Sequence, residues 1–352
     1  MIHSSFKINS TSFTKDSLVV YANLLLHNKE QYLIDIGSFL LDWLDNSKKI
    51  KVQTSGSTGK PKIIELQKEH MANSALATGE FFNCKENTKA LLCLSANYIA
   101  GKMMLVRAMV LGWNIYLVEP SSSFLADTDD EFDFSAMVPL QVEASLQDLH
   151  KIKQLIIGGA PVSNSLNQQL QNLTTKCYAT YGMTETITHI AVKKLNNLEA
   201  KSNESELFKI LPNVTIKTDN RECLVINAAK VSNEQIVTND IVKLHSSTSF
   251  QWLGRYDNVI NSGGVKLFPE QIEEKLSQLI KIPFFVASLP NERLGQKLVL
   301  IIESNKTLQL SKEKLKEVGL TNYQFPKEVY SLPVFIRTAT GKVQRIKTLD
   351  LL

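Results

Sequence analysis

Short apolar runs alternate with longer helical stretches over the first half of the chain, and this pattern constrains the fold more than any other feature. The apolar runs fall at 63–66, 90–94, 115–118 and 155–157. The stretches with apolar residues three and four apart fall at 69–82, 102–111 and 163–173. Alternation of strands and helices is typical of an α/β sheet. The first fifty residues also show helical spacing and are expected to be helical.

The pattern changes twice in the second half of the chain. After about residue 207 we expect strands at 224–226, 241–244 and 250–253, which indicate a smaller β unit. A second change falls at 254–264. Beyond it the pattern predicts a helix at 269–279, strands at 284–289 and 298–302, and a charged helix at 311–318. These elements predict a separate α+β domain.

Length and charge limit the classes of function. The chain has 352 residues, and at about 150 residues per domain this suggests roughly two domains. Lysine and arginine number 39 against 35 acidic residues, with no basic cluster of the kind that nucleic-acid binding needs. No secretory leader and no run of about 18 apolar residues is present, so stable membrane insertion is not expected. The four cysteines form no Cys-x-x-Cys pair, which favours reduced thiols and a cytoplasmic protein.

A loop rich in hydroxyls and glycines lies between two β-like runs. It reads QTSGSTGKPK from Gln53 to Lys62. Glycine lets backbone amides approach an anion, and hydroxyls and lysines add donors and charge. A polar surface turn would use the same residue types. The string is not a Walker A loop, because Gly59 and Lys60 are followed by Pro61.

The literal string resembles the phosphate-binding motif of the adenylate-forming superfamily, which includes acyl-CoA synthetases, luciferases and peptide-synthetase adenylation domains. The resemblance implies that the loop holds the β- and γ-phosphates of ATP. The residues concerned are Thr54, Ser55, Gly56, Ser57, Thr58, Gly59 and Lys60.

A second string, TYGMTE, resembles the next signature of this superfamily. It comprises Thr180, Tyr181, Gly182, Met183, Thr184 and Glu185. Tyr181 can stack on an adenine, Thr184 can donate to a phosphate, and Glu185 can hold Mg²⁺, which prefers oxygen ligands. Taken singly, Tyr181 is as well explained by core packing, and Glu185 by a helix start.

Three further matches follow the order of the superfamily. Gly158, Gly159 and Ala160 form a turn that lies against the adenine in the resembled family. Thr238-Asn239-Asp240 resembles its Thr-Gly-Asp, with Asp240 on the ribose, and we expect Asn239 to allow a left-handed turn. The segment LGRYDNVINSGGVKLFPEQIE supplies Arg255 for the ribose, Asp257 as the hinge, and Gly263 and Gly264 for the thiol channel. A glycine hairpin explains Gly263 and Gly264 alone, but not the flanking matches.

The last match, TATGKVQR at 338–345, resembles the C-terminal lysine motif and implies that Lys342 is catalytic. A lone lysine in a polar turn is otherwise a solvated surface residue. Together the motifs imply an α/β fold with a large N-terminal AMP-binding domain, 1–255, made of mixed sheets, flanking helices and a β subdomain. A small mobile α+β domain, 256–352, carries the lysine.

The resemblance implies an ATP-dependent acid–thiol ligase that uses ATP, Mg²⁺ and coenzyme A. A carboxylate attacks the α-phosphate of ATP to give an acyl-adenylate and pyrophosphate, and a thiol then displaces AMP. Lys342, Thr184 and Glu185 would serve the first step, with Glu185 on the metal. The C-terminal domain would then rotate about Asp257.

The acid is suggested by one more segment. In LSANYIAGKMMLVRAMVLGW, Tyr98 and Gly101 align with the acyl-pocket region of the superfamily, and either Lys102 or Arg107 can pair with a second carboxylate. Both cations can equally be solvent-facing helix charges. This segment and TYGMTETITHIA resemble the compact o-succinylbenzoate–CoA ligases of menaquinone biosynthesis.

Three alternatives stay open at this point: a ligase for another aryl or fatty acid, a stand-alone enzyme that loads a carrier protein, and a non-catalytic nucleotide-binding regulator. The retained motifs rank the last one low. The superfamily usually places a longer segment before the phosphate loop than residues 1–53. A homodimer could complete the walls of the site, although nothing in the sequence shows one.

Overall fold

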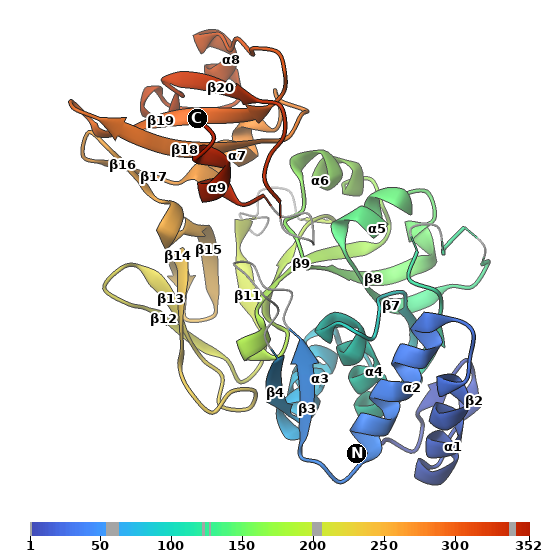
Figure 1. Cartoon of the computed structure of the whole chain (residues 1–352). Coiled ribbons are helices and arrows are strands. Elements are labelled where there is room, and N and C mark those ends of the chain that lie inside the picture. The colour runs from blue at the N-terminus through green and yellow to red at the C-terminus, as the bar shows by residue number, and fades with distance from the viewer. Residues whose placement is uncertain (1, 54–62, 122–123, 127, 199–205, 338–342) are drawn as a thin grey trace.

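A computed structural model describes residues 2–53, 63–121, 124–126, 128–198, 206–337 and 343–352 (Figure 1). The phosphate-loop residues 54–60 and Lys342 therefore lie outside the described residues. Within that part of the chain, no helix is long and apolar enough to cross a membrane.

Thirteen of the described strands form one large sheet, in which a block of neighbouring strands is parallel. The strand order is β12-β13-β14-β15-β11-β10-β9-β8-β7-β5-β6-β1-β2. The parallel strands are β1 (Lys7–Ile8), β6 (Asn114–Leu117), β5 (Lys89–Leu92), β7 (Phe132–Met137), β8 (Ile152–Ile157) and β9 (Lys176–Gly182). The predicted α/β alternation is confirmed.

The remaining strands of this sheet are antiparallel. They are β2 (Thr11–Ser12), β10 (His189–Lys194), β11 (Phe208–Ile210), β12 (Thr215–Thr218), β13 (Cys223–Asn227), β14 (Ile236–Ser246) and β15 (Ser249–Arg255). The expected β unit after residue 207 therefore exists, but it is joined to the α/β sheet through β10 and β11. A separate hairpin, β3 (Lys49–Gln53) and β4 (Ile63–Gln67), flanks the phosphate-loop sequence.

The helices of the large domain follow their sequence signals closely. They are α1 (Lys15–Leu26), α2 (Gln31–Leu44), α3 (Lys68–Phe82), α4 (Ile99–Leu111), α5 (Pro139–Ala144) and α6 (Asn164–Leu170). Thr14 caps α1 through a capping box with Ser17. Gly112 ends α4 with a φ of 71°, a left-handed conformation that suits glycine. The expectation that the first fifty residues are helical was incomplete, because β1 and β2 precede α1 and pair at the sheet edge.

The C-terminal elements form a second sheet with its own core, seen at the top of Figure 1. They are β16 (Ile260–Ser262), β17 (Val265–Leu267), α7 (Pro269–Leu276), β18 (Phe284–Asn291), β19 (Gly295–Glu303), α8 (Lys312–Glu317), β20 (Glu328–Leu332) and α9 (Arg345–Leu349). Among the described residues, every hydrophobic cluster lies wholly before Leu253 or wholly after Val259. This separation supports a domain boundary at 255–256, which stays a proposal.

Candidate active site

Asp240 is the centre of one half of the candidate site. Its side chain is 8% exposed. Its carboxylate accepts hydrogen bonds from the Tyr181 hydroxyl at 2.7 Å and from the Trp252 indole N–H at 3.3 Å. Arg255 lies 3.4 Å from the same carboxylate. Burial and the neighbouring Asp240 charge raise the pKa of Tyr181 well above its usual value. The structure therefore brings the predicted ribose residues Asp240 and Arg255 together with the predicted adenine residue Tyr181.

The aromatic ring of Tyr181 is packed as well as hydrogen-bonded. It meets Phe250 edge-on, with ring centroids 5.2 Å apart, and Phe208 at 5.7 Å. The core-packing explanation for Tyr181 is thus partly correct. Such packing fixes the plane against which a flat ligand can stack.

The turn expected at Asn239 is absent. Asn239 lies inside β14 and is not among the residues with positive φ. Its side chain instead accepts a hydrogen bond from Arg221 at 2.9 Å and donates to Asp257 at 3.3 Å. Asparagine replaces glycine here without strain, because the strand continues through Asp240.

The glycine turn at 158–160 lies beside β9. A Cβ atom on Gly158 would lie 2.4 Å from the Thr180 hydroxyl oxygen, and Gly159 has a φ of 82°. Both positions therefore require glycine, one for space and one for backbone conformation. Ala160 follows them and is exposed. The turn and the TYGMTE string are thus in contact.

A strained residue follows TYGMTE. Thr184–Thr186 form a 3-10 turn, Glu185 is exposed, and Met183 precedes the turn. Ile187 then has a φ of 67°, which is unusual for a β-branched side chain. A Cβ on Gly182 would lie 2.2 Å from the Thr188 carbonyl oxygen, so the chain folds tightly back on itself. Strain of this kind clusters at functional sites.

Arg107 defines the other half of the candidate site. It is 2% exposed and lies in α4, whose residues from Met103 to Val110 are all buried. Its guanidinium donates to Thr78 Oγ1 and Thr188 Oγ1, both at 3.4 Å, and to Met104 Sδ at 3.6 Å. Within the described residues no carboxylate forms an ion pair with it. Burial lowers the pKa of Arg107 to about 10.

His189 is the neutral neighbour of this cation. It is 6% exposed, and its Nε2 lies 3.5 Å from Thr78 Oγ1. Burial and the Arg107 charge lower the pKa of His189 well below its usual value. In the sheet, His189 on β10 is the register partner of Gly182 on β9. The two halves of the site are therefore joined through adjacent strands.

The other predicted pocket residues lie differently. Lys102 donates to the Ala96 carbonyl at 2.6 Å and lies 5.0 Å above the Phe39 ring, so it already has partners. Tyr98 is 58% exposed. A Cβ on Gly101 would lie 2.2 Å from the Ser95 carbonyl oxygen, so this glycine serves close backbone packing. Of the two candidate cations, Arg107 alone is buried without a carboxylate partner in the described chain.

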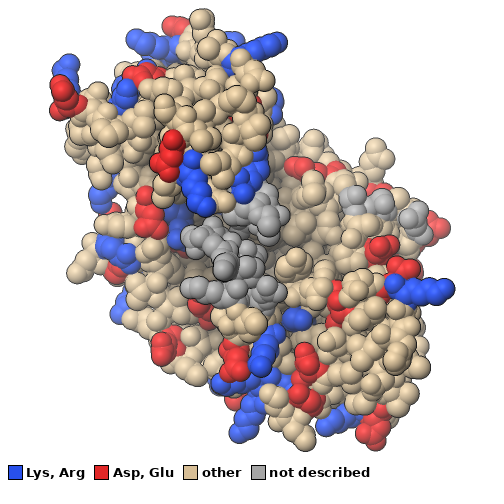
Figure 2. Space-filling view, viewed as in Figure 1, with Lys and Arg blue, Asp and Glu red and all other residues tan. Residues whose placement is uncertain are grey.

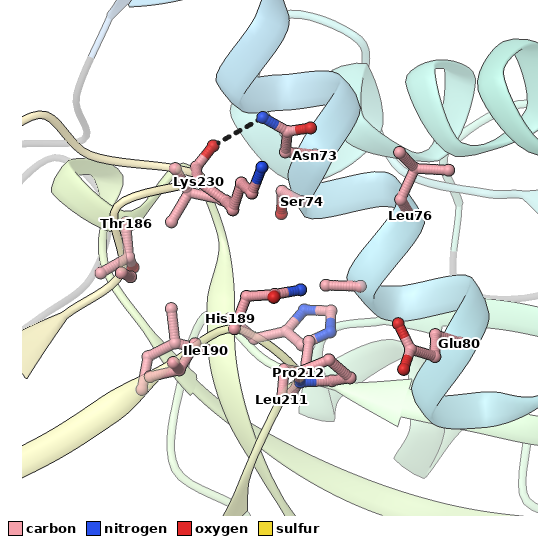
Figure 3. Close-up of a pocket in the computed structure, with 15 residues that line it drawn as sticks. Asn73, Ser74, Leu76, Glu80, Thr186, His189, Ile190, Leu211, Pro212 and Lys230 are labelled. Carbon is pink, nitrogen blue, oxygen red and sulfur yellow. Dashed lines mark hydrogen bonds between the residues drawn. The ribbon is translucent and has the colours of Figure 1, made fainter.

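His189 lines a cavity of about 260 Å³ (Figure 3). His189 and Thr186 face it from one wall, and Ser74 and Glu80 of α3 from the other. Ser74 also lies 3.2 Å from Thr188 Oγ1. The cavity thus adjoins the hydroxyls that surround Arg107.

The hinge and thiol-channel candidates lie on the surface. Asp257 is 61% exposed, in a 3-10 turn (Tyr256–Asn258), and its carboxylate lies 3.8 Å from the Arg255 guanidinium. Gly263 and Gly264 have φ angles of 58° and 83° and turn the chain between β16 and β17. Nothing lies within 4 Å of a Cβ built on Gly264, so the turn is open to approach.

Cation ligands are sparse in the described structure. Within it, no group of three or more His, Cys, Asp or Glu side chains could hold a metal ion. On the face shown in Figure 2, basic and acidic side chains are interspersed.

Sequence reasoning missed four polar residues around Arg107: Ser74, Thr78, Thr188 and His189. Thr188 and His189 directly follow the TYGMTE string, so their position in TYGMTETITHIA was an available signal. Ser74 and Thr78 lie on one face of α3, four residues apart. Nothing in the sequence showed that this face meets Arg107, because the contact depends on the packing of α3 against α4.

Comparison with known proteins identifies the family of this chain. Residues 52–228, half of the chain, match the family described as AMP-binding enzyme. The chain is 25% identical over 324 aligned residues to 2-succinylbenzoate–CoA ligase of Staphylococcus aureus strain MSSA476, covering 84% of this chain. It spans only 65% of that relative's length.

Two solved structures extend the comparison. An acyl-CoA synthetase (AMP-forming)/AMP-acid ligase II-like protein from Dyadobacter fermentans is 37% identical, with a TM-score of 0.64, and the match covers 94% of this chain and 97% of that one. The Bacillus subtilis o-succinylbenzoate coenzyme A synthetase, solved with ATP and a magnesium ion, is 20% identical. Its TM-score is 0.73, with 85% of this chain and 69% of that chain covered.

The Bacillus subtilis structure shares the fold of this chain. The Dyadobacter fermentans protein is also similar in sequence, and the match covers nearly all of both chains. The family match covers β3 to β13, including TYGMTE and the Arg107 helix. The family model matches half of the chain, and the chain therefore belongs to the AMP-binding enzyme family.

Proposed function

We propose that this protein is an AMP-forming acid–CoA ligase that converts 2-succinylbenzoate to its CoA thioester in menaquinone biosynthesis. The observation that carries the choice of acid is the Arg107 guanidinium, which is buried without a carboxylate partner in the described chain. A buried cation is costly unless it is paired. A dicarboxylic acid would present one carboxylate to ATP and the other to Arg107.

The nucleotide would lie beside the Gly158–Ala160 turn and the TYGMTE string. Tyr181 would stack on the adenine, with the Gly158–Ala160 turn beside it, and Asp240 and Arg255 would hold the ribose. Their side chains fit such a group, since Asp240 offers carboxylate oxygens next to a fixed aromatic plane. Mg²⁺ on Glu185 would offset charge on the phosphates.

Lys342 and the 54–60 loop would stabilise the charge that builds on the phosphate oxygens in the first step. Both lie outside the described residues, so their roles rest on the resemblance. The free thiols of Cys84, Cys93, Cys177 and Cys223 support a reducing, cytoplasmic setting. A dimer stays an open proposal.

A panel of carboxylic acids tests the proposal. Purified protein with ATP, Mg²⁺ and CoA should release pyrophosphate with 2-succinylbenzoate and form its CoA thioester, as mass spectrometry would detect. Preference for a medium-chain fatty acid would overturn the choice of acid. Acyl-adenylate formation without CoA transfer would instead indicate loading of a carrier protein.

The assignment of Lys342 is tested separately. Lys342→Ala should lose adenylation and keep thiolation of a supplied acyl-adenylate. Equal loss of both half-reactions would remove Lys342 from its assigned role.

A further inference from the structure

Two arginines flank the residues 338–342, which include Lys342. Arg337 comes directly before them, and Arg345 follows shortly after. Arg337 and Val343 pair as an antiparallel bridge, and the Gln344 N–H donates to the Ile336 carbonyl at 2.8 Å. The two ends of this segment are therefore held side by side by described residues.

Each arginine forms an ion pair with a carboxylate from a different element. Arg337 donates through both terminal nitrogens to Glu303 at the end of β19, at 2.5 Å each. Arg345 donates to Glu273 of α7 at 2.7 Å and lies 5.7 Å above the Phe285 ring. Each carboxylate also accepts a backbone N–H at 2.7 Å, from Phe335 and Val286 respectively. Arg337 thus forms a two-point fork with Glu303, whereas Arg345 reaches Glu273 through one terminal nitrogen and donates to the Val286 carbonyl at 3.5 Å through the other.

The α7 helix links this arrangement to the large domain. The Asn164 side chain of α6 donates to the Glu274 carbonyl and lies 3.1 Å from the Ser277 hydroxyl, both in or next to α7. Glu273 is the neighbour of Glu274 in the chain, and its side chain is 17% exposed. The Arg345–Glu273 pair therefore connects the end of the lysine segment to the helix that touches the large domain.

We propose that Arg345 and Glu273 are positioning residues for the adenylation half-reaction, because their ion pair fixes Arg345, three residues after Lys342 in the chain, against α7. Partly buried ion pairs contribute little net stability compared with apolar groups, and geometry is what they fix. Arg337 and Glu303 secure the other end. This inference rests on the proposed ligase function.

The test separates the two half-reactions. Arg345→Lys keeps the charge but loses the planar group that donates to both the Glu273 carboxylate and the Val286 carbonyl, and Glu273→Gln keeps the shape but loses the charge. In each variant kcat for pyrophosphate release should fall roughly 10- to 100-fold, the effect of a small misplacement of a catalytic group. KM for ATP and for the acid, and thiolation of supplied acyl-adenylate, should stay within about twofold of wild type.

A matched control lies in the same sheet. Lys297→Gln removes the 2.5 Å ion pair between Lys297 of β19 and Glu328 of β20, and neither residue bonds to Arg337 or Arg345 in the described structure. It should leave both half-reactions unchanged. Equal loss of both half-reactions in Arg345→Lys and Glu273→Gln, or no loss in either, would overturn the inference. If Arg345→Lys does not fold, Glu273→Gln decides. A wild-type protein without any pyrophosphate release would contradict the ligase function itself.

Discussion

The two halves of the site handle charge in opposite ways. Around Asp240, a buried carboxylate meets a phenol, an indole and the Arg255 guanidinium, so the anion is paired by the protein itself. Around Arg107, a buried guanidinium meets only hydroxyls and a thioether in the described chain, and its histidine neighbour is held neutral. The Asp240 half is therefore electrostatically complete before a ligand binds. On the proposed function, the Arg107 half would gain its counter-charge from the second carboxylate of the substrate.

Replacing Arg107 gives the largest expected effect. Arg107→Met should lower kcat/KM for 2-succinylbenzoate by about 100- to 1000-fold, within the range for removing one partner of a buried charge pair. The free energy of unfolding should stay equal or rise, because an unpaired buried charge is replaced by an apolar group of similar length. Steady-state kinetics and urea denaturation measure the two effects.

Lys102→Met is the matched variant, since Lys102 was the rival candidate. It should change kcat/KM by about fivefold at most, the value of one cation–π contact. A larger effect for Lys102→Met than for Arg107→Met would reverse the assignment. An Arg107→Met loss of equal size with a monocarboxylic acid would remove the dicarboxylate argument.

Asp240→Ala should affect stability in the opposite direction. The Tyr181 hydroxyl and the Trp252 N–H would lose their acceptor, and the free energy of unfolding should fall by about 3 kcal/mol. The same variant should also show a higher KM for ATP. Asp130→Ala removes an exposed ion pair with Lys89 and should cost no more than about 1 kcal/mol. A stabilised Asp240→Ala variant would erase the contrast between the two halves.

Tyr181→Phe tests a single contact within the paired half. The ring and its packing against Phe250 remain, while the 2.7 Å hydrogen bond to Asp240 is lost. Thermal or urea unfolding should show a loss of about 1.5 kcal/mol. A loss near zero would mean that water replaces the Tyr181 hydroxyl as a hydrogen-bond donor to Asp240. Solvent would then reach Asp240 more easily than its low exposure indicates.

Lowering the pH should reduce the free energy of unfolding through His189, the neighbour of Arg107. The folded-state pKa of His189 lies below its unfolded value near 6.5, so the unfolded chain takes up a proton that the folded chain refuses. The stability is therefore present above pH 6.5 and falls as the pH drops, by about 1 kcal/mol between pH 6.5 and 5.5. Urea titrations of wild type and His189→Gln measure it. An unchanged pH dependence in His189→Gln would contradict the assignment.

The fold was largely predictable from the sequence, and the reason is local. The apolar periods at α3 and β4 and the glycine after α4 each specify one element without help from the rest of the chain. β7 was missed because Asp133 interrupts an otherwise apolar run that follows an acidic stretch. Its pairing between β5 and β8 supplies what the local pattern lacks.

The site was predictable only where literal strings exist. Tyr181, Asp240 and Arg255 come from distant motifs, and the structure brings them into contact. The burial of Arg107 could not be inferred, because a helix buried on all sides carries no polar face to mark its orientation. Thr78 and Ser74 belong to the site through helix packing alone.

The C-terminal sheet has its own hydrophobic core, so the chain can be considered as two parts joined by a short link. No hydrophobic cluster in the described residues bridges the link at Tyr256–Asn258, so each side retains its core if the link is cut. The covalent link then matters mainly as a tether. Short tethers give partners an effective concentration in the millimolar range. Fragments ending and beginning near this turn should regain ligase activity only when mixed at comparably high concentration, which makes the chain a candidate for a split reporter.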